Sequence, residues 1–314
     1  MTTYDENLGY VYLPGKYLVH WKQYDFMGKI KKEHLATETV NSEGYRITSG
    51  NYLKANFKPE VWIFGCSFTF GSYLNDDQTF PYIIQKKYQE LEVKNYARGG
   101  YGQIHNLLQY EDLIKRAAKK KVYPKMVIVT YAPFHLERNI ASDERLYRLR
   151  NHAKHVVVHV PAAKLNENKE LEIFYKSLGV ETKKNDSKNE KVFAVEVTKQ
   201  IFDRISISAK KHNISLLVAT FNVNIQDDDV LKYLAINKYT IVSLNVDHLK
   251  NKYNLFPFDG HPNALANELY AKIIIEKMQS FLIFDLVSHK KSSIFVFPEK
   301  SKVRNCCMLS GVIN

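Results

Sequence analysis

The sequence is poor in cysteine and has no long hydrophobic run. Its 314 residues contain three cysteines, Cys66, Cys306 and Cys307, which are too few for a disulfide framework and lack zinc-site spacing to histidine. No apolar run approaches the roughly 18 residues that a transmembrane helix needs. Residues from Met1 to Asn7 show no basic region followed by an apolar core, so no secretion signal is visible. We therefore expect a cytoplasmic protein without a metal site or a membrane span, although a secreted chain trimmed of its signal is also compatible.

Acidic residues are scarce relative to basic ones. The chain has 33 Asp and Glu against 45 Lys and Arg, which gives a formal net charge of +12. Such a charge suits nucleic acid, an anionic glycan or a membrane surface as a partner. The lysines are scattered, however, and their one dense cluster, at 115–121, fits the solvated end of a helix. We therefore expect no nucleic-acid partner.

Strand-like and helix-like segments alternate along most of the chain, which predicts βαβ units and an α/β fold with a parallel sheet. The expected strands begin at Val61 and continue at 91–96, 125–131, 214–221 and 240–244. The expected helices lie between them, at 79–90, 103–120, 193–212, 228–236 and 264–281.

Three segments depart from this alternation and define the expected domain organisation. Residues 1–58, rich in tyrosine and broken by glycine, predict irregular structure with short strands, packed as an extension on a core domain at 59–285. Within that core, residues 140–191 predict an insertion that covers the edge of the active site, with a short helix at 144–151 and with 155–160 and 171–175 as a hairpin or as two edge strands. Residues 286–314 match no pattern and are interpreted as a C-terminal tail.

The stretch that organises the chain is residues 61–71, VWIFGCSFTFG. An apolar strand breaks at Gly65 and presents Ser67 ahead of a helix, which is where open α/β sheets bind ligands. Helix-start N–H groups beside that serine suit an oxyanion. The alternative is a buried serine in a strand-to-helix turn. Because adjacent side chains of a strand point to opposite sides, we expect Cys66 to face the core.

A second motif supplies the partners that a serine nucleophile needs. Residues 256–266 read FPFDGHPNALA and precede the last amphipathic helix. His261 is placed to take the serine proton, and Asp259 to fix its tautomer and stabilise the imidazolium. The alternative is a capping aspartate with an incidental surface histidine. A second pair, Asp247 and His248, lacks the Pro-Asn turn and the long helix and is set aside.

Two further blocks follow strands. Residues 95–102, NYARGGYG, form a glycine-rich turn that lets backbone N–H groups approach a ligand, without the Gly-x-Gly-x-x-Gly spacing of dinucleotide sites. No cofactor is therefore expected. His135 and Asn139 follow the strand at 125–131, and each can donate a hydrogen bond to an oxyanion. The alternative is that both brace the loop, through His135 or an Arg138 salt bridge.

These blocks, in this order, resemble those of the SGNH (GDSL-type) hydrolases over about residues 60–281. The segment GCSFTFG resembles the Gly-Asp-Ser block, with Cys66 in place of the aspartate, and Gly100 aligns with the glycine that donates to the oxyanion. DGHPNA resembles the last block, with His261 two residues after Asp259 rather than three. His135 stands where the Asn-Asp pair of the family would be.

The resemblance implies a three-layer α/β/α sandwich of flavodoxin-like type with a mostly parallel sheet. It also implies a catalytic triad of Ser67, Asp259 and His261. The oxyanion hole would be formed by Ser67, Gly100 and either His135 or Asn139. Residues 41–46, NSEGYR, resemble a stretch that some SGNH-like proteins carry before the serine block, and no chemistry is assigned to them.

The implied chemistry is hydrolysis or transfer of an acyl group from an ester, without a cofactor. Three interpretations remain open at this point. The first is an esterase that removes O-acyl groups, with acetyl on a carbohydrate as the expected substrate. The second is an acyltransferase that uses the same serine to acylate a glycan. The third is a glycan-binding relative without catalysis.

Overall fold

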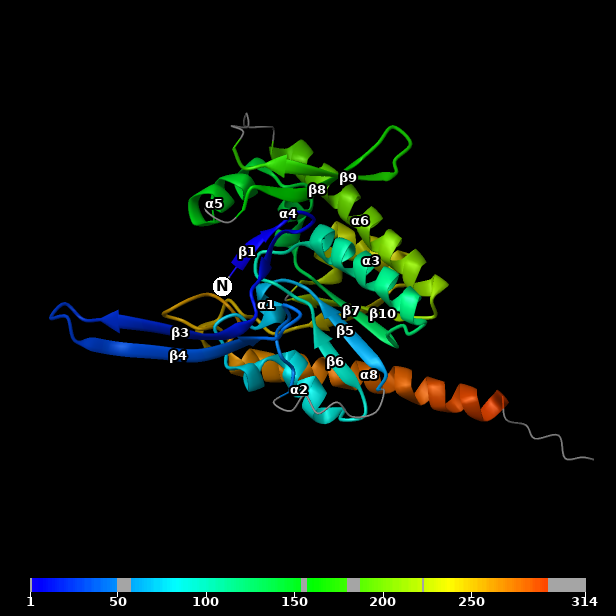
Figure 1. Ribbon diagram of the computed structural model, residues 1–314, viewed down its shortest axis with the longest axis horizontal. Coiled ribbons are helices and arrows are strands. Elements are labelled where there is room, and N and C mark those ends of the chain that lie inside the picture. The colour runs from blue at the N-terminus through cyan, green and yellow to red at the C-terminus, as the bar shows by residue number, and fades with distance from the viewer. Residues whose placement is uncertain (1, 50–57, 154–156, 180–186, 222, 293–314) are drawn as a thin grey trace, which may run out of the picture. The chain divides into compact units, whose positions relative to one another are not determined.

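The computed structural model describes residues 2–49, 58–153, 157–179, 187–221 and 223–292 (Figure 1). Its centre is a five-stranded sheet in the order β11-β10-β7-β5-β6, in which all neighbouring strands are parallel. When these five strands are numbered 1 to 5 along the chain and the sheet is followed from β6 to β11, the order is 2-1-3-4-5, which is flavodoxin-like. The predicted α/β fold with a parallel sheet is therefore confirmed. The strands are β5 (Glu60–Phe64), β6 (Glu92–Asn95), β7 (Met126–Tyr131), β10 (Ser215–Phe221) and β11 (Thr240–Leu244).

Helices cover both faces of this sheet, which gives the three predicted layers (Figure 1). On one face, apolar side chains of α3 (Gln103–Lys120), α6 (Ser187–Lys211) and α7 (Asp229–Ile236) form one core cluster with those of the strands. On the other face lie α2 (Phe80–Lys87) and the first turns of α8 (Ala264–Ser292), joined where the Phe80 N–H donates to Asn267 Oδ1 at 3.1 Å. Residues 1–275 form one compact unit, and α8 continues into a second unit that begins at Glu276.

The N-terminal region differs from its prediction. It contains two hairpins, one of β1 (Thr2–Asp5) with β2 (Gly9–Tyr12) and one of β3 (Gly15–Tyr24) with β4 (Ile30–Val40). The prediction of irregular structure with short strands was wrong for β3 and β4, which are ten and eleven residues long. The glycines that suggested breaks stand at hairpin ends instead: Gly15 begins β3, and Gly28 lies in the turn with φ 77°.

The segment that was predicted to be an insertion packs on α3 and α6 through its strands. A hairpin of β8 (His159–Leu165) with β9 (Leu171–Ser177) confirms the predicted strand pair, with the first strand four residues later than expected. Before it come α4 (Leu136–Asn139) and α5 (Asp143–Ala153). Most of the expected tail at 286–314 lies outside the described residues. The remaining short elements are α1 (Ser67–Phe70) and the 3-10 turns η1 (Asp76–Gln78), η2 (Pro133–His135), η3 (Ile225–Asp227) and η4 (Asn251–Tyr253).

None of the helices in the described part of the chain is long and apolar enough to cross a membrane.

Candidate active site

Ser67 lies at the carboxyl edge of the sheet, as the first residue of the short helix α1. The helix is tied to neighbouring strands: the Thr69 and Thr130 hydroxyls are 2.7 Å apart, and the Asn95 side chain donates to the Thr69 carbonyl at 3.1 Å. Gly65 permits this approach, because a Cβ atom there would collide with both threonine side chains. The serine is therefore held on a braced turn between β5, β6 and β7.

The neighbouring thiol is not a rival nucleophile. Cys66, the residue before α1, is fully buried, which confirms the expectation that it faces the core. Burial raises the pKa of the Cys66 thiol, so the reactive thiolate is disfavoured. Ser67, in contrast, is partly exposed.

Asp259 and His261 form a pair in the loop before α8. The Asp259 Oδ1 atom accepts the His261 backbone N–H at 2.7 Å and also contacts the ring nitrogen Nδ1. Burial alone would raise the pKa of Asp259, but the hydrogen bonds from His261 outweigh it and hold that pKa below its ordinary value. An ionised carboxylate on Nδ1 places the ring proton there and leaves Nε2 as the nitrogen that can accept a proton.

The His261 ring lies between two aromatic side chains that come from α1 and the loop after it. Its centroid is 5.3 Å from that of Phe68 and 5.1 Å from that of Tyr73, both in edge-on contact. Since Phe68 follows Ser67 directly, the loop with the histidine and the helix with the serine meet at this point. The hydrogen bond from Ser67 to His261 itself stays a prediction.

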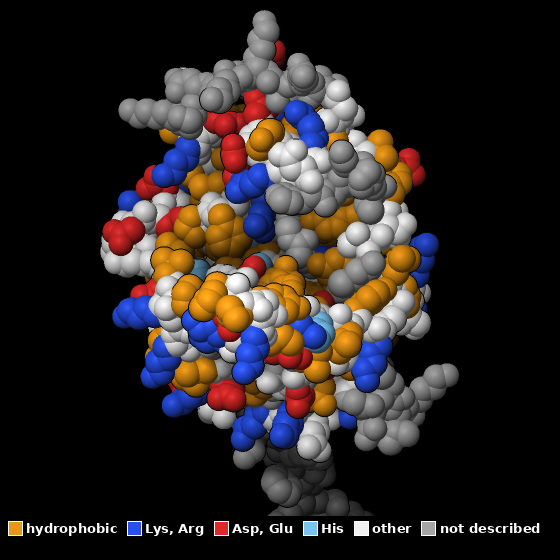
Figure 2. Space-filling model, turned by 90° about the vertical axis from the view of Figure 1, so that its left-hand side faces the viewer, with side chains coloured by type: hydrophobic (Ala, Val, Ile, Leu, Met, Phe, Trp, Pro, Cys, Tyr) orange, Lys and Arg blue, Asp and Glu red, His pale blue; other side chains and the backbone are white. Residues whose placement is uncertain are grey.

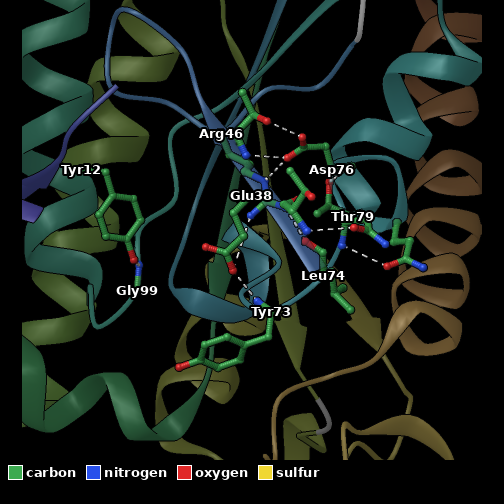
Figure 3. A network of polar contacts seen from close by, with 12 residues as sticks. Tyr12, Glu38, Arg46, Tyr73, Leu74, Asp76, Thr79 and Gly99 are labelled. Carbon is green, nitrogen blue, oxygen red and sulfur yellow. Dashed lines mark hydrogen bonds and ion pairs between the residues drawn. The ribbon is translucent and has the colours of Figure 1, made fainter. Parts of the chain in front are cut away.

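Two tyrosines of β2 hold the glycine turn that follows β6. The Gly99 N–H donates to the Tyr12 hydroxyl at 2.9 Å (Figure 3). The Tyr10 hydroxyl donates to the Gly99 carbonyl at 2.7 Å. Gly100 has φ 79° and its carbonyl accepts from Arg145 at 2.9 Å. A Cβ at Gly100 would collide with the Tyr10 hydroxyl, so glycine is required there both by conformation and by space. A Cβ at Gly99 would lie 3.9 Å from the Cβ of Ser67, which places this turn beside the serine.

His135 and Asn139 are both completely buried, and they differ in their partners. The Asn139 amide is engaged at both ends: its oxygen accepts the Ile104 N–H at 3.1 Å, and its nitrogen donates to Thr198 at 2.7 Å. The His135 ring accepts the Ala132 N–H at Nδ1, while its Nε2 has no hydrogen-bond partner among the described residues. Burial lowers the pKa of His135 well below its ordinary value, so the ring is neutral. Of the two residues, only His135 has a side-chain nitrogen with no recorded hydrogen bond among the described residues, so these contacts favour it over Asn139 as a third oxyanion donor.

Two residues near the site were missed by sequence reasoning. His248, set aside with Asp247, has its ring 4.9 Å from that of Phe68, on the same aromatic ring that contacts His261. Burial lowers the pKa of His248, so its ring is neutral where it packs against Phe68. Tyr73 has φ 70°, a left-handed backbone that non-glycine residues rarely adopt and that often occurs at functional sites. The sequence offers His248 only as part of a pair that lacks the Pro-Asn turn, and it gives no signal for Tyr73, because both contacts depend on tertiary packing.

A buried ion network holds Tyr73 in place (Figure 3). Arg46, whose side chain is fully buried, contacts Asp76 at 2.9 Å and Glu38 at 3.8 Å, and donates to the Leu74 carbonyl at 2.7 Å. Glu38 in turn accepts the Tyr73 N–H at 2.5 Å. The network therefore anchors the loop after α1 to β4, and it gives the NSEGYR stretch a structural role through its arginine.

An aromatic cluster continues outward from Tyr73. The Trp21 ring of β3 lies 4.3 Å from Tyr73 and 6.3 Å from Phe258, and His34 lies 5.8 Å from Phe258. Phe258 precedes Asp259 directly. The rim of the site on this side is thus formed by aromatic rings of the long hairpin and of the loop that carries the histidine.

A separate cleft of about 510 Å³ lies between the N-terminal hairpin and α3. Neither Ser67 nor the Asp259–His261 pair lines it, so it is distinct from the candidate site. The described residues contain no group of three or more His, Cys, Asp or Glu side chains that could hold a metal ion.

Comparison with known proteins finds similarity only among solved structures. No family model matches the chain, and no curated protein matches it. The psychrotrophic esterase EstA from Pseudoalteromonas sp. is 10% identical with a TM-score of 0.42, covering 72% of this chain and 99% of that one. A lipolytic protein of the G-D-S-L family from Veillonella parvula is 13% identical with a TM-score of 0.41, covering 69% and 96%. The SGNH-hydrolase family esterase AlinE4 is 11% identical with a TM-score of 0.39, covering 75% and 98%. Of these three structures, two are esterases and one is a lipolytic protein of the G-D-S-L family.

Proposed function

We propose that this protein is a serine-dependent ester hydrolase of SGNH type that removes O-acyl groups, with acetyl on a carbohydrate as the expected substrate. The observation that carries the proposal is the Asp259–His261 pair. The carboxylate occupies Nδ1, so Nε2 is the free base, and the ring contacts the residue next to Ser67. A base with this orientation beside a partly exposed serine on a strand-to-helix turn is the arrangement that acyl transfer requires.

In the proposed mechanism, His261 Nε2 takes the Ser67 proton as the hydroxyl oxygen attacks the acyl carbon. Asp259 stabilises the imidazolium that forms. The backbone N–H groups of Ser67 and Gly100 donate to the developing oxyanion. His261 then gives the proton to the leaving alcohol, and water releases the acyl group by the same sequence of proton transfers.

The aromatic rim supports a carbohydrate as the leaving group. Tyr73 contacts the His261 ring edge-on, and Trp21 packs against both Tyr73 and Phe258, so an aromatic cluster continues outward from the histidine. Apolar faces of sugar rings pack on aromatic rings, and such rings lose little entropy when they bind because they have few rotatable bonds.

An esterase assay on the purified chain tests the proposal. Release of acetate from acetylated sugars should exceed release from acetyl esters of simple alcohols. The same assay with an added sugar acceptor distinguishes hydrolysis from acyl transfer, since a transferase would move the acetyl group to the acceptor instead of releasing acetate. A chain that turns over no ester under either condition would contradict the proposal and favour a glycan-binding protein.

The pH profile is expected to follow one ionisation. Because the pKa of Asp259 is held below its ordinary value of 3.8, this carboxylate is ionised at every pH at which histidine titrates. The rate should therefore rise with pH across the range of about 5 to 8 in which a histidine general base acts, because only the neutral form of a base can take the serine proton. His248→Asn is the matched control, because burial lowers the pKa of His248, and the rise should persist in that variant. A rate that is flat across this range would rule out His261 as the base.

The third oxyanion donor is tested by a pair of variants. If His135 donates through Nε2, His135→Ala should lower kcat by about a hundredfold or more with a smaller effect on KM, because the bond matters mainly in the transition state. Asn139→Ala should mainly lower the melting temperature, since it leaves the Ile104 N–H without an acceptor. The opposite pattern would assign the donor to Asn139. If neither variant lowers kcat beyond a few-fold, the site works with two backbone donors.

A further inference from the structure

The hairpin of β3 and β4 projects as an arm from the rest of the compact unit formed by residues 1–275 (Figure 1). Its base is fixed: Trp21 packs on Tyr73 at 4.3 Å, and His34 Nε2 lies 2.6 Å from the Tyr73 carbonyl. Beyond this base, every residue from 22 to 33 except Asp25 is exposed. At about 3.4 Å per residue, the tip stands roughly 17 Å beyond its last support.

The tip of the arm is apolar, and its turn is closed by hydrogen bonds. Phe26 is 97% exposed and Met27 is 77% exposed, which are extreme values for such large side chains. The Asp25 carboxylate accepts the N–H groups of Met27 and Lys29 at 2.9 Å each, which closes the turn and leaves both apolar side chains pointing outward. Tyr24 and Ile30, also exposed, extend the apolar surface from the turn to the strand ends.

Basic residues surround this apolar tip. Lys22, Lys29, Lys31 and Lys32 are all exposed, against a single exposed carboxylate on the same segment, that of Glu33. Figure 2, which views the molecule from the side toward which the arm points, shows hydrophobic side chains there with Lys and Arg around them. The combination suits an anionic lipid interface, where apolar side chains enter the acyl boundary and long lysine side chains reach the phosphates.

We propose that the arm tip, residues 24–32, docks the protein onto an anionic membrane surface. Two observations favour lipid over a second copy of this chain. Each copy carries a formal charge of +12, so two chains repel one another, whereas anionic lipid attracts the whole molecule as well as the tip. The apolar side chains also stand on a convex projection rather than on a flat face, and such a projection can enter a headgroup layer without a preformed groove.

Co-sedimentation of the full chain with vesicles tests the proposal. We expect binding to phosphatidylcholine vesicles that contain about a third phosphatidylglycerol, and much weaker binding to phosphatidylcholine alone. The double variant Phe26→Glu with Met27→Glu should lose roughly a hundredfold or more of the binding, because it removes the inserting groups and adds negative charge. Lys31→Gln with Lys32→Gln should weaken vesicle binding by roughly thirtyfold. High salt should also weaken vesicle binding of the unaltered chain, because it screens the attraction between the lysines and the lipid phosphates.

A matched control separates the tip from general charge effects. Ile207→Glu with Ile236→Glu removes two apolar side chains that are also highly exposed, at 69% and 79%, and adds the same charge on α6 and α7. This variant should bind vesicles nearly as well as the unaltered chain. The Phe26/Met27 variant and the Ile207/Ile236 variant should both keep the melting temperature and any activity toward a soluble ester. The vesicle result is therefore independent of the proposed hydrolase function.

A direct reading of insertion comes from Phe26→Trp. The fluorescence of the added indole should shift to shorter wavelength with phosphatidylglycerol vesicles and be quenched by brominated lipid. Three results would overturn the proposal: no binding to either vesicle, equal loss of binding in the tip variant and the control, or an unshifted indole signal from the Phe26→Trp variant in its bound state. Concentration-dependent dimerisation that the tip variant abolishes, without vesicle binding, would instead make the arm a contact between copies of the chain.

Discussion

Ester turnover should disappear when Ser67 is replaced by alanine, while the fold stays intact. The hydroxyl is the proposed nucleophile, and without it the covalent acyl intermediate cannot form. We expect kcat to fall by at least about 10⁴-fold, toward the background that the remaining site supplies. Labelling by a fluorophosphonate probe should be lost together with activity, because the same oxygen attacks phosphorus.

The adjacent thiol provides the control for this experiment. Cys66 is fully buried next to Ser67, so Cys66→Ala removes the neighbouring thiol and leaves the Ser67 hydroxyl in place. That variant should still react with the probe, and it should show at most a modest loss of thermal stability because only one buried atom is removed. Labelling that persists in Ser67→Ala, or that is lost in Cys66→Ala, would overturn the assignment of the nucleophile.

The parallel sheet could be predicted because its signals are local. Each buried strand, such as 126–131, is a short apolar run between turn residues, and each following helix has its own periodicity. The candidate site residues follow from the same logic, since carboxyl ends of parallel strands meet at one edge. The sequence therefore predicts that Ser67 and the glycine turn lie at one edge of the sheet.

What the sequence could not reveal depends on contacts between distant segments. The β3–β4 arm was missed because Gly15 and Gly28, which form its ends, also suit an irregular segment. Tyr73 and His248 carry no motif, and their place beside Phe68 and His261 is decided by packing. The same holds for Arg46, which lies in a recognisable stretch whose role appears only when β4 meets the loop after α1.

The N-terminal region is consequently part of the site rather than a cover over it. Tyr12 from β2 binds the N–H of Gly99 in the glycine turn, and Glu38 from β4 binds the N–H of Tyr73 in the loop against His261. The two sides of the candidate site thus depend on segments that precede the parallel sheet in the chain. A variant in this region should affect both stability and turnover, even though it contacts no reacting atom.

Arg46→Met is the most destabilising single change expected in this region. Methionine fills similar space, but it leaves the Glu38 and Asp76 carboxylates without their cation in a buried setting. Breaking a buried ion pair from one side typically costs about 3–5 kcal/mol, which for a domain of this size corresponds to a fall in melting temperature of roughly 5–15 °C. Arg204→Met is the matched control, because Arg204 makes an equally close pair with Glu111, at 2.6 and 2.9 Å, on the surface. Its expected cost is at most about 1 kcal/mol.

The loss of folding stability in the Arg46→Met variant should depend on pH, because the substitution changes the pKa of Glu38. Burial already raises the pKa of Glu38, and loss of the arginine removes the charge that opposes this shift. A carboxyl group whose pKa is higher in the folded state stabilises the fold at low pH and loses that contribution as the pH rises through the folded pKa. The deficit relative to the unaltered chain should therefore be largest at neutral pH and shrink toward acid, and Arg46→Met with Glu38→Gln should recover part of it. A deficit equal to that of Arg204→Met, or one that grows toward acid, would show that the buried network does not hold this loop.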